Sequence, residues 1–282
     1  MKNKIAYQGA KGSYSEALLA DRFDDYIYYP KESFSQVVES IKVGEVDFGL
    51  LPIENSIAGT VVDSYEELIR SGIPIISEYM YKISHALIGL KGSNIDKIVE
   101  VHSHPQALQQ CKTFIDQMGY KAIPVVDTGG SVYNLINENK KEIAAIAGDH
   151  FEMEDEFVIL KKNISDNEQN YTRFLLLGEE SLKVEADEYK TSTVLISSDK
   201  PGSLLKALQE FASLNLNLTK LESRPILGRP WEYKFYIDFS SDKNDERIKV
   251  LEENLEDVVE DIHFLGTYPC LLYTSPSPRD RG

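Results

Sequence analysis

The sequence predicts an α/β protein in which two α/β lobes face each other across a cleft and a ferredoxin-like βαββαβ unit follows. Two observations predict this architecture. Between about residues 4 and 178, short apolar runs alternate with segments of helical periodicity, as in parallel sheets with right-handed crossovers. After a polar, acidic stretch at 179–190, the order becomes strand, helix, strand, strand, helix, strand, which is the split βαβ pattern.

Composition limits the classes of function. With 282 residues, of which 42% are hydrophobic and 27% charged, the chain is long enough for two domains with their own cores. Lysine and arginine number 30 against 46 acidic residues, so the net charge is −16. This balance disfavours a nucleic-acid partner, and it requires that an anionic substrate be held by local donors.

Cysteine content and hydropathy indicate the compartment. The two cysteines have neither disulfide-framework nor metal-ligand spacing. The start of the chain runs into a strand without an apolar signal region, and no apolar run approaches the ~18 residues of a membrane span. We therefore expect a cytoplasmic protein with no membrane partner.

The first lobe begins with a strand at 5–7 and a helix at 13–22. Ser13 and Glu16 form a capping box at the start of that helix. A second helix begins at Ser33 and buries one apolar face. Further along, we expect a strand at 47–51, a helix at 61–69 and an extended segment at 73–76.

The second lobe, at about 80–160, repeats the alternation. We expect extended segments at 83–90, 97–101, 122–126 and 143–147, and helices at 105–118 and 131–139. A glycine turn at 127–131 ends one strand and could donate backbone amides to the cleft. A plain connection is at least as good an interpretation of that turn.

The last third is a smaller module. We expect strands at 191–197, 216–224, 232–239 and 261–265, and helices at 202–214 and 245–256. The domains are therefore 1–180 and 190–269. Residues 270–282, which contain Ser-Pro repeats, are expected to be a disordered, non-native tail similar to vector read-through.

Polar side chains stand at the mouths of predicted strands. Asn170-Tyr171-Thr172-Arg173 opens the apolar run 174–177, where open α/β sheets place their ligand crevices. A guanidinium beside a hydroxyl suits a small anion whose chemistry needs one proton. Glu54-Asn55-Ser56 follows another strand, and simple helix capping is its alternative role.

A third segment is 103–111. Ser103 is expected to cap a helix with Pro105 in its first turn, and Gln110 lies about two turns in, where an amide could orient a substrate. The alternative is a well-capped surface helix. His102 and His104 have no third ligand for a metal, and the loop 9–15 lacks nucleotide-binding spacing.

In this order and spacing, segments 9–15, 51–59, 103–111 and 170–174 resemble the catalytic region of the prephenate dehydratase family. Segments 201–204 and 221–225 resemble its ACT regulatory domain, so the resemblance covers about residues 4 to 269. It implies a catalytic domain like periplasmic binding proteins, in the monofunctional form. It also implies a lyase that converts prephenate to phenylpyruvate, with loss of carbon dioxide and water, in phenylalanine biosynthesis without metal or organic cofactor.

The resemblance also implies roles for individual residues. Thr172 would be the catalytic hydroxyl, helped by Asn55, Ser103 and Gln110. Substrate would also be bound by Ser13, Glu54, Ser56, His104 and Arg173. Allosteric phenylalanine would bind between ACT domains of paired subunits, in a homodimer or homotetramer, at Gly202, Ser203, Leu204, Asn217, Leu218 and Ser223.

Two alternatives stay open at this stage. One is an arogenate dehydratase, whose substrate carries an amino group in place of the side-chain carbonyl. The other is a non-catalytic amino-acid-sensing binding protein, since two lobes around a cleft are also a solute-binding architecture. Segments 127–132 and 148–157 depart from the usual family pattern, which affects one wall of the second lobe rather than the reaction.

Overall fold

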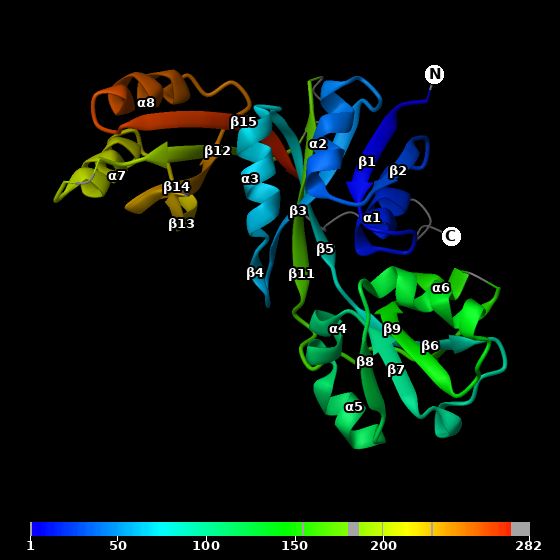
Figure 1. Cartoon of the computed structure of the whole chain (residues 1–282). Coiled ribbons are helices and arrows are strands. Elements are labelled where there is room, and N and C mark those ends of the chain that lie inside the picture. Colours follow the sequence, from blue (N-terminus) through cyan, green and yellow to red (C-terminus); the bar gives the residue numbers. More distant parts are fainter. Residues whose placement is uncertain (1, 154, 180–185, 199, 227, 272–282) are drawn as a thin grey trace. The chain divides into compact units, whose positions relative to one another are not determined.

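The computed structural model describes residues 2–153, 155–179, 186–198, 200–226 and 228–271, and it forms two compact units (Figure 1). The first unit holds the described chain up to Glu67 together with Met80–Phe174. The second holds Leu68–Tyr79 and the described chain from Leu175 onward. Three elements, α3, β5 and β11, therefore contribute residues to both units.

The first lobe of the first unit is a sheet with the strand order β11-β3-β1-β2. Strand β1 is parallel to both β2 and β3, as expected, although β2 was not predicted. The strands are β1 (Lys4–Gln8), β2 (Ile27–Lys31), β3 (Phe48–Asn55), the short β4 (Gly59–Thr60) and β11 (Tyr171–Gly178). The helices are α1 (Tyr14–Arg22), α2 (Phe34–Lys42) and α3 (Val62–Ser71).

The capping prediction for α1 is confirmed with one change. The Ser13 hydroxyl accepts from the Glu16 amide at 3.3 Å, as a helix cap does. The Glu16 carboxylate, however, accepts from the amide of Gly12 at 2.6 Å rather than from that of Ser13. The loop before α1 is therefore tied to the helix that follows it.

The second lobe is a five-stranded sheet with the order β10-β6-β9-β7-β8. Its strands are β6 (His85–Leu90), β7 (Glu100–Ser103), β8 (Lys121–Pro124), β9 (Ile143–Gly148) and β10 (Phe157–Lys161), and β5 (Ile75–Lys82) leads into it. Its helices are α4 (Pro105–Gln110), α5 (Lys112–Met118) and α6 (Thr128–Glu138), with 3₁₀ turns η1 (Ile95–Lys97) and η2 (Asp149–Met153).

The expectation of purely parallel sheets is wrong for this lobe. Strand β7 is parallel to β8 and β9, but β6 is antiparallel to β9 and β10 is antiparallel to β6. The physical reason is connection length. Segment 91–99, which joins β6 to β7, is shorter than the dozen or so residues that a parallel crossover needs, so β7 runs in the direction opposite to β6.

Helix boundaries in the second lobe also differ from those expected. The predicted helix 105–118 is broken at Cys111 into α4 and α5. Helix α6 begins at Thr128 with an Asp127 cap, so Gly129 and Gly130 are helical rather than a turn. Glycine is required at 129, since a Cβ there would lie 2.6 Å from the carbonyl carbon of Gly12 in the first lobe.

The second unit confirms the predicted ferredoxin-like order. Its antiparallel strands lie in the order β13-β14-β12-β15, and helices α7 and α8 share a core with them. The elements are β12 (Tyr189–Ile196), α7 (Ser203–Ser213), β13 (Leu218–Ile226), β14 (Arg229–Ser241), α8 (Arg247–Glu256) and β15 (Asp261–Leu271). None of the described helices is long and apolar enough to cross a membrane.

The predicted tail begins two residues too early. Strand β15 runs to Leu271, and Cys270 is in register with Glu78 of β5. Cys270 and Leu271 are thus in a strand because their backbone pairs with a neighbour. The remainder of the predicted tail, 272–282, lies outside the described residues.

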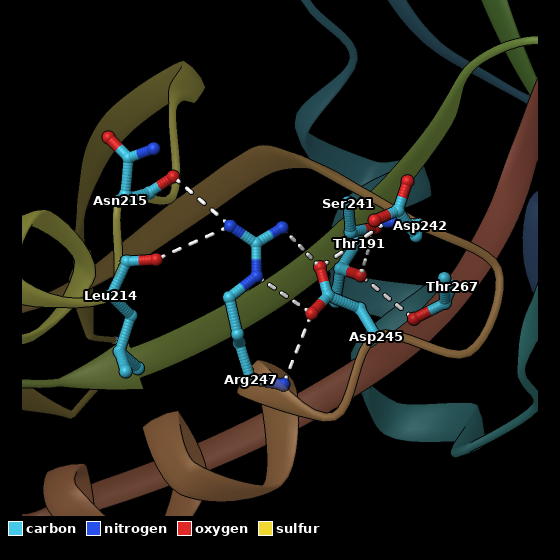
Figure 2. A network of polar contacts seen from close by, with 8 residues as sticks. All are labelled: Thr191, Leu214, Asn215, Ser241, Asp242, Asp245, Arg247 and Thr267. Carbon is cyan, nitrogen blue, oxygen red and sulfur yellow. Dashed lines mark hydrogen bonds and ion pairs between the residues drawn. The ribbon is translucent and has the colours of Figure 1, made fainter.

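In the second unit, the guanidinium group of Arg247 joins the start of α8 to the chain that follows α7 (Figure 2). Arg247 donates to both carboxylate oxygens of Asp245, at 2.8 and 2.7 Å, and to the carbonyls of Leu214 and Asn215, each at 3.3 Å. The Asp245 side chain is only 4% exposed. The hydrogen bonds from Arg247 lower the pKa of this carboxyl below its usual range.

We predict that Asp245→Asn lowers the free energy of unfolding by about 1–3 kcal/mol at pH 7, the usual worth of a hydrogen bond to a charged group. Because the folded-state pKa of Asp245 is lowered, its contribution is complete above the unfolded carboxyl pKa of about 4 and is lost as pH falls through the folded value. Thermal melts at pH 7 and pH 3 measure this. The exposed Glu253→Gln is the control, and an equal Asp245→Asn deficit at both pH values would contradict the prediction.

Candidate active site

A cavity of about 330 Å³ in the first unit is lined by polar side chains from both lobes. This volume falls in the range of small-molecule sites. Strand ends and helix starts from both lobes form its wall. The lining residues are Gln8, Gly9, Ala10, Ser13, Tyr14, Ser15, Pro52, Asn55, Val61, Ile83, His85, His104, Gln106, Ala107, Gln110, Val126, Asp127, Thr128, Gly129, Thr172 and Phe174.

Asn55, the last residue of β3, has both ends of its amide committed. Its Oδ1 accepts from the backbone amides of Ile57 and Ala58, at 3.1 and 2.9 Å. Its Nδ2 therefore faces the other way, and it donates to Oδ1 of Asn170 at 2.7 Å and to Oγ1 of Thr172 at 3.0 Å. Backbone donors can pair only with an acceptor, so they fix the orientation of this amide.

This orientation decides the role of the Thr172 hydroxyl. Since Asn55 donates to Oγ1, the threonine proton is not used in that bond and is available to another acceptor. Thr172 and Phe174 both line the cavity, as side chains two apart on a strand share a face. The hydroxyl can thus act as a proton donor inside the cavity.

The amide of Gln110, at the end of α4, is held by both lobes. Its Oε1 lies 3.1 Å from Nδ2 of Asn170 and 2.8 Å from Nε2 of His85, and both of these atoms donate to it. Its Nε2 is buried and has no partner among the described residues. A buried unpaired N–H is costly unless a ligand accepts from it, so this atom is a candidate substrate contact.

The described lining of the cavity offers neutral hydrogen-bond donors rather than cationic side chains. Its described lining includes no lysine or arginine, and Asp127 is its carboxylate. Burial lowers the pKa of His85, which favours a neutral imidazole there. Helices α1 and α6 start at the cavity, and the free amides of helix N-termini attract anions.

Five of the nine residues predicted to be catalytic or substrate-binding line the cavity: Ser13, Asn55, His104, Gln110 and Thr172. Four do not: Glu54, Ser56, Ser103 and Arg173.

Ser103 illustrates the difference between a sequence motif and its geometry. It is fully buried, and its hydroxyl donates to the carbonyl of Ile146 at 2.6 Å, within the sheet of the second lobe. The expected cap of α4 is also wrong at this position. His104 is the cap, because the helix begins at Pro105 and Nδ1 of His104 accepts from the amide of Gln106.

The other three residues lie beside the cavity. The Ser56 hydroxyl accepts from the amide of Tyr171 and donates to the carbonyl of Gln169, so it joins the end of β3 to the start of β11. Glu54 and Arg173 alternate with Asn55 and Thr172 along their strands, which turns them to the opposite faces.

Sequence reasoning did not single out Tyr14, His85 or Asn170. Tyr14 lies in segment 9–15 and Asn170 in segment 170–174, but nothing in the spacing of either residue distinguishes it from an ordinary loop residue. His85 is a lone imidazole in an otherwise apolar strand, and it is only 2% exposed. A buried titratable group in an apolar run was the available signal, because such a group needs a partner.

The fold and this cavity define a two-lobed small-molecule enzyme that carries a βαββαβ unit. The family model described as PDT, prephenate dehydratase, matches residues 5–182. The chloroplastic arogenate dehydratase/prephenate dehydratase 2 of Arabidopsis thaliana is 34% identical over 276 residues, covering 94% of this chain and 72% of that protein. The prephenate dehydratase of Methanocaldococcus jannaschii is 35% identical over 280 residues, covering 95% and 99%.

Two solved structures are similar over nearly the whole chain. The prephenate dehydratase of Arthrobacter aurescens in complex with L-Phe has a TM-score of 0.85 at 28% identity, covering 94% of this chain and 89% of that one. GqqA, described as a quorum quenching acylase, has a TM-score of 0.85 at 27% identity, covering 95% and 98%.

The chain belongs to the prephenate dehydratase family. The predicted function in phenylalanine biosynthesis and the predicted class, a carbon–oxygen lyase, are thereby confirmed. The fold class is confirmed as well, as two α/β lobes followed by a βαββαβ unit.

We predict that Asn55→Asp lowers kcat by about 10²-fold, the usual cost of removing one preorganised donor. The substitution keeps the shape of the side chain but replaces the Nδ2 donor to Thr172 and Asn170 with an acceptor. Steady-state kinetics measures the effect, and Asn139→Asp, at the exposed end of α6, is the matched control. Unchanged kcat in Asn55→Asp would show that this donor serves only the fold.

Proposed function

We propose that Thr172 gives its hydroxyl proton to the leaving hydroxyl of prephenate, while Asn55 and Gln110 hold the reacting groups. The observation that carries this proposal is the 3.0 Å hydrogen bond from Nδ2 of Asn55 to Oγ1 of Thr172. It leaves the threonine proton free for the substrate. It also puts a donor on the oxygen that becomes negative as the proton departs.

The reaction balances with this one proton. The bond from the ring to its carboxylate breaks, carbon dioxide leaves, and the bonding electrons enter the ring. The ring C–O bond breaks at the same time, and the departing oxygen takes the proton of Thr172 to become water. The Thr172 oxygen then regains a proton from solvent, so the net change is prephenate plus one proton to phenylpyruvate, carbon dioxide and water.

The cavity supplies the remainder of the catalysis through orientation and environment. Val61, Ile83, Ala107 and Phe174 give it an apolar wall, against which the ring can lie. Holding both leaving groups in the reactive alignment is worth up to ~7–11 kcal/mol. The carboxylates meet amide N–H groups and helix starts, which suits an enzyme whose net charge repels anions.

We propose further that residues 1–180 form the catalytic domain and residues 190–269 the regulatory domain, with phenylalanine as effector. A cavity of about 360 Å³ in the second unit supports this. Gly202, Ser203 and Leu204, predicted for this role, line it together with Trp231 and Tyr233. The start of α7 has no side-chain cap, and although the Ser203 amide donates to the carbonyl of Lys200, the next amides of the first turn can meet a carboxylate.

The other three predicted effector residues, Asn217, Leu218 and Ser223, do not line that cavity. Asn217 and Ser223 are exposed on or next to β13, at the edge of the sheet. Their placement fits the proposal only if a second subunit brings another surface to this edge.

A homodimer or homotetramer in the cytoplasm is therefore part of the proposal. The second unit exposes apolar side chains near its cavity: Leu205 at 61%, Trp231 at 84% and Tyr233 at 42%. Exposed apolar groups that cluster favour an interface with another chain.

We predict that Thr172→Ala lowers kcat by at least ~10²-fold with a smaller effect on KM, because a positioned proton donor contributes about 10²–10⁴-fold. Thr172→Ser keeps the hydroxyl and should retain most of the activity. Formation of phenylpyruvate, followed by absorbance, measures both variants. Near-normal turnover by Thr172→Ala would remove this hydroxyl from the mechanism.

We predict that phenylalanine changes the fluorescence of Trp231, the single tryptophan of the chain, and lowers the rate of turnover in the same concentration range. The effector must bind the two functional states unequally for this to hold. Gly202→Val, which places a branched side chain at a position with φ of 85°, should weaken both responses. A flat rate across millimolar phenylalanine would end the regulatory proposal and leave the catalytic one intact.

The alternative substrate is arogenate. Asp127 is the carboxylate in the cavity lining, and an ammonium group on the substrate could pair with it. Measurement of kcat/KM for prephenate and arogenate on one preparation decides which is preferred. Binding of prephenate in a calorimeter without any turnover would instead favour an amino-acid-sensing binding protein.

A further inference from the structure

His85 lies at the start of β6 with both ring nitrogens engaged. Nε2 is 2.8 Å from Oε1 of Gln110, and Nδ1 is 2.8 Å from Oη of Tyr14. The tyrosine hydroxyl also donates to the carbonyl oxygen of Ser84, at 2.9 Å. Tyr14 comes from α1 in the first lobe, whereas His85 and Gln110 come from the second.

The donor and the acceptor of each hydrogen bond in this network can be assigned in turn, starting from Asn55. Asn55 must present Nδ2 to Asn170, because Ile57 and Ala58 occupy its oxygen. Asn170 therefore accepts through Oδ1 and donates through Nδ2, so the Gln110 atom that it meets is an oxygen.

The assignment continues to Tyr14. An amide oxygen only accepts, so Nε2 of His85 carries a hydrogen and donates to Gln110. In a neutral imidazole Nδ1 is then an acceptor, so the Tyr14 hydroxyl shares its single proton between Nδ1 and the carbonyl oxygen of Ser84. Neither nitrogen of His85 is left for the substrate, so the ring is not placed to be the acid or base of the reaction.

We propose that His85 and Tyr14 are positioning residues, which fix the Gln110 amide so that its Nε2 donates to the substrate in the cavity. This inference rests on the proposed function, in which Gln110 contacts the substrate. Without His85, Oε1 of Gln110 keeps only Asn170, and the amide can rotate to present its oxygen to an anionic substrate. The lone pairs of the amide oxygen then face an anionic group of the substrate where a hydrogen bond is required.

Two amide replacements of His85 separate positioning from packing. In His85→Gln the new Nε2 is three bonds from Cβ, like Nε2 of the imidazole, and can donate to Gln110. In His85→Asn the new Nδ2 is one bond shorter, so it corresponds to Nδ1 and cannot reach Gln110. Both side chains are polar and of similar size, which makes them a matched pair.

We expect His85→Asn to lower kcat/KM about tenfold or more and His85→Gln to stay within about threefold of the original protein. In a Gln110→Ala background the same His85→Asn change should have no further effect, since residues that act through one another are not additive. The exposed His263→Asn serves as a control variant. Tyr14→Phe should cause a smaller loss than His85→Asn, because it removes the hydrogen bonds to Nδ1 and to the Ser84 carbonyl but leaves the donor from Nε2 to Gln110 in place.

The outcomes distinguish this inference from the proposed function. Full activity in Gln110→Ala would remove Gln110 from catalysis and leave His85 without a role there. An impaired Gln110→Ala together with equal losses in His85→Asn and His85→Gln would overturn the positioning role alone. Thermal melts identify variants that do not fold. Nitrogen-15 NMR of the unmodified protein, which should show a hydrogen on Nε2 of His85 near pH 7, tests the assignment without any substitution, and a hydrogen on Nδ1 instead would refute it.

Discussion

The site depends on the orientation of one side-chain amide, that of Asn55. Two backbone N–H groups in the turn after β3 hold its oxygen, and its nitrogen is consequently directed to Thr172 and Asn170. Every later donor and acceptor in the network follows from this choice, because each amide that accepts at one end must donate at the other. A local turn thus determines which groups donate and which accept in hydrogen bonds that join the two lobes.

This arrangement suits an acidic protein that binds a dianion. A cationic side chain would attract the substrate strongly, but it would also attract the anionic product, whereas neutral N–H groups supply direction without net charge. The described lining of the cavity has neutral N–H donors and no lysine or arginine. The small exposed fractions of Asn55, Asn170 and Thr172 keep water from competing for these bonds.

The sequence allowed the architecture and much of the site to be predicted, because both follow from local patterns. Alternating apolar periodicity located most strands and helices, and polar residues at strand ends identified Asn55 and Thr172. What could not be predicted depends on pairing at a distance. The hydroxyl of Ser103 lies within a sheet because β7 pairs with β9, and no local pattern shows that. Tyr14 is 71 residues from His85 in sequence, and Gln110 is 60 residues from Asn170. Hydrophobic periodicity carries no information about contacts between such distant residues.

The close approach of Gly129 to Gly12 has a mechanical consequence. Gly129 belongs to α6 of the second lobe and Gly12 to the loop before α1 of the first, and neither carries a side chain that would separate the two backbones. A methyl group at residue 129 would press the two backbones apart, and the hydrogen bonds that cross the lobes, from Tyr14 to His85 and from Asn170 to Gln110, would lengthen as well. The spacing of the lobes and the chemistry of the cavity are thus coupled through one absent carbon atom.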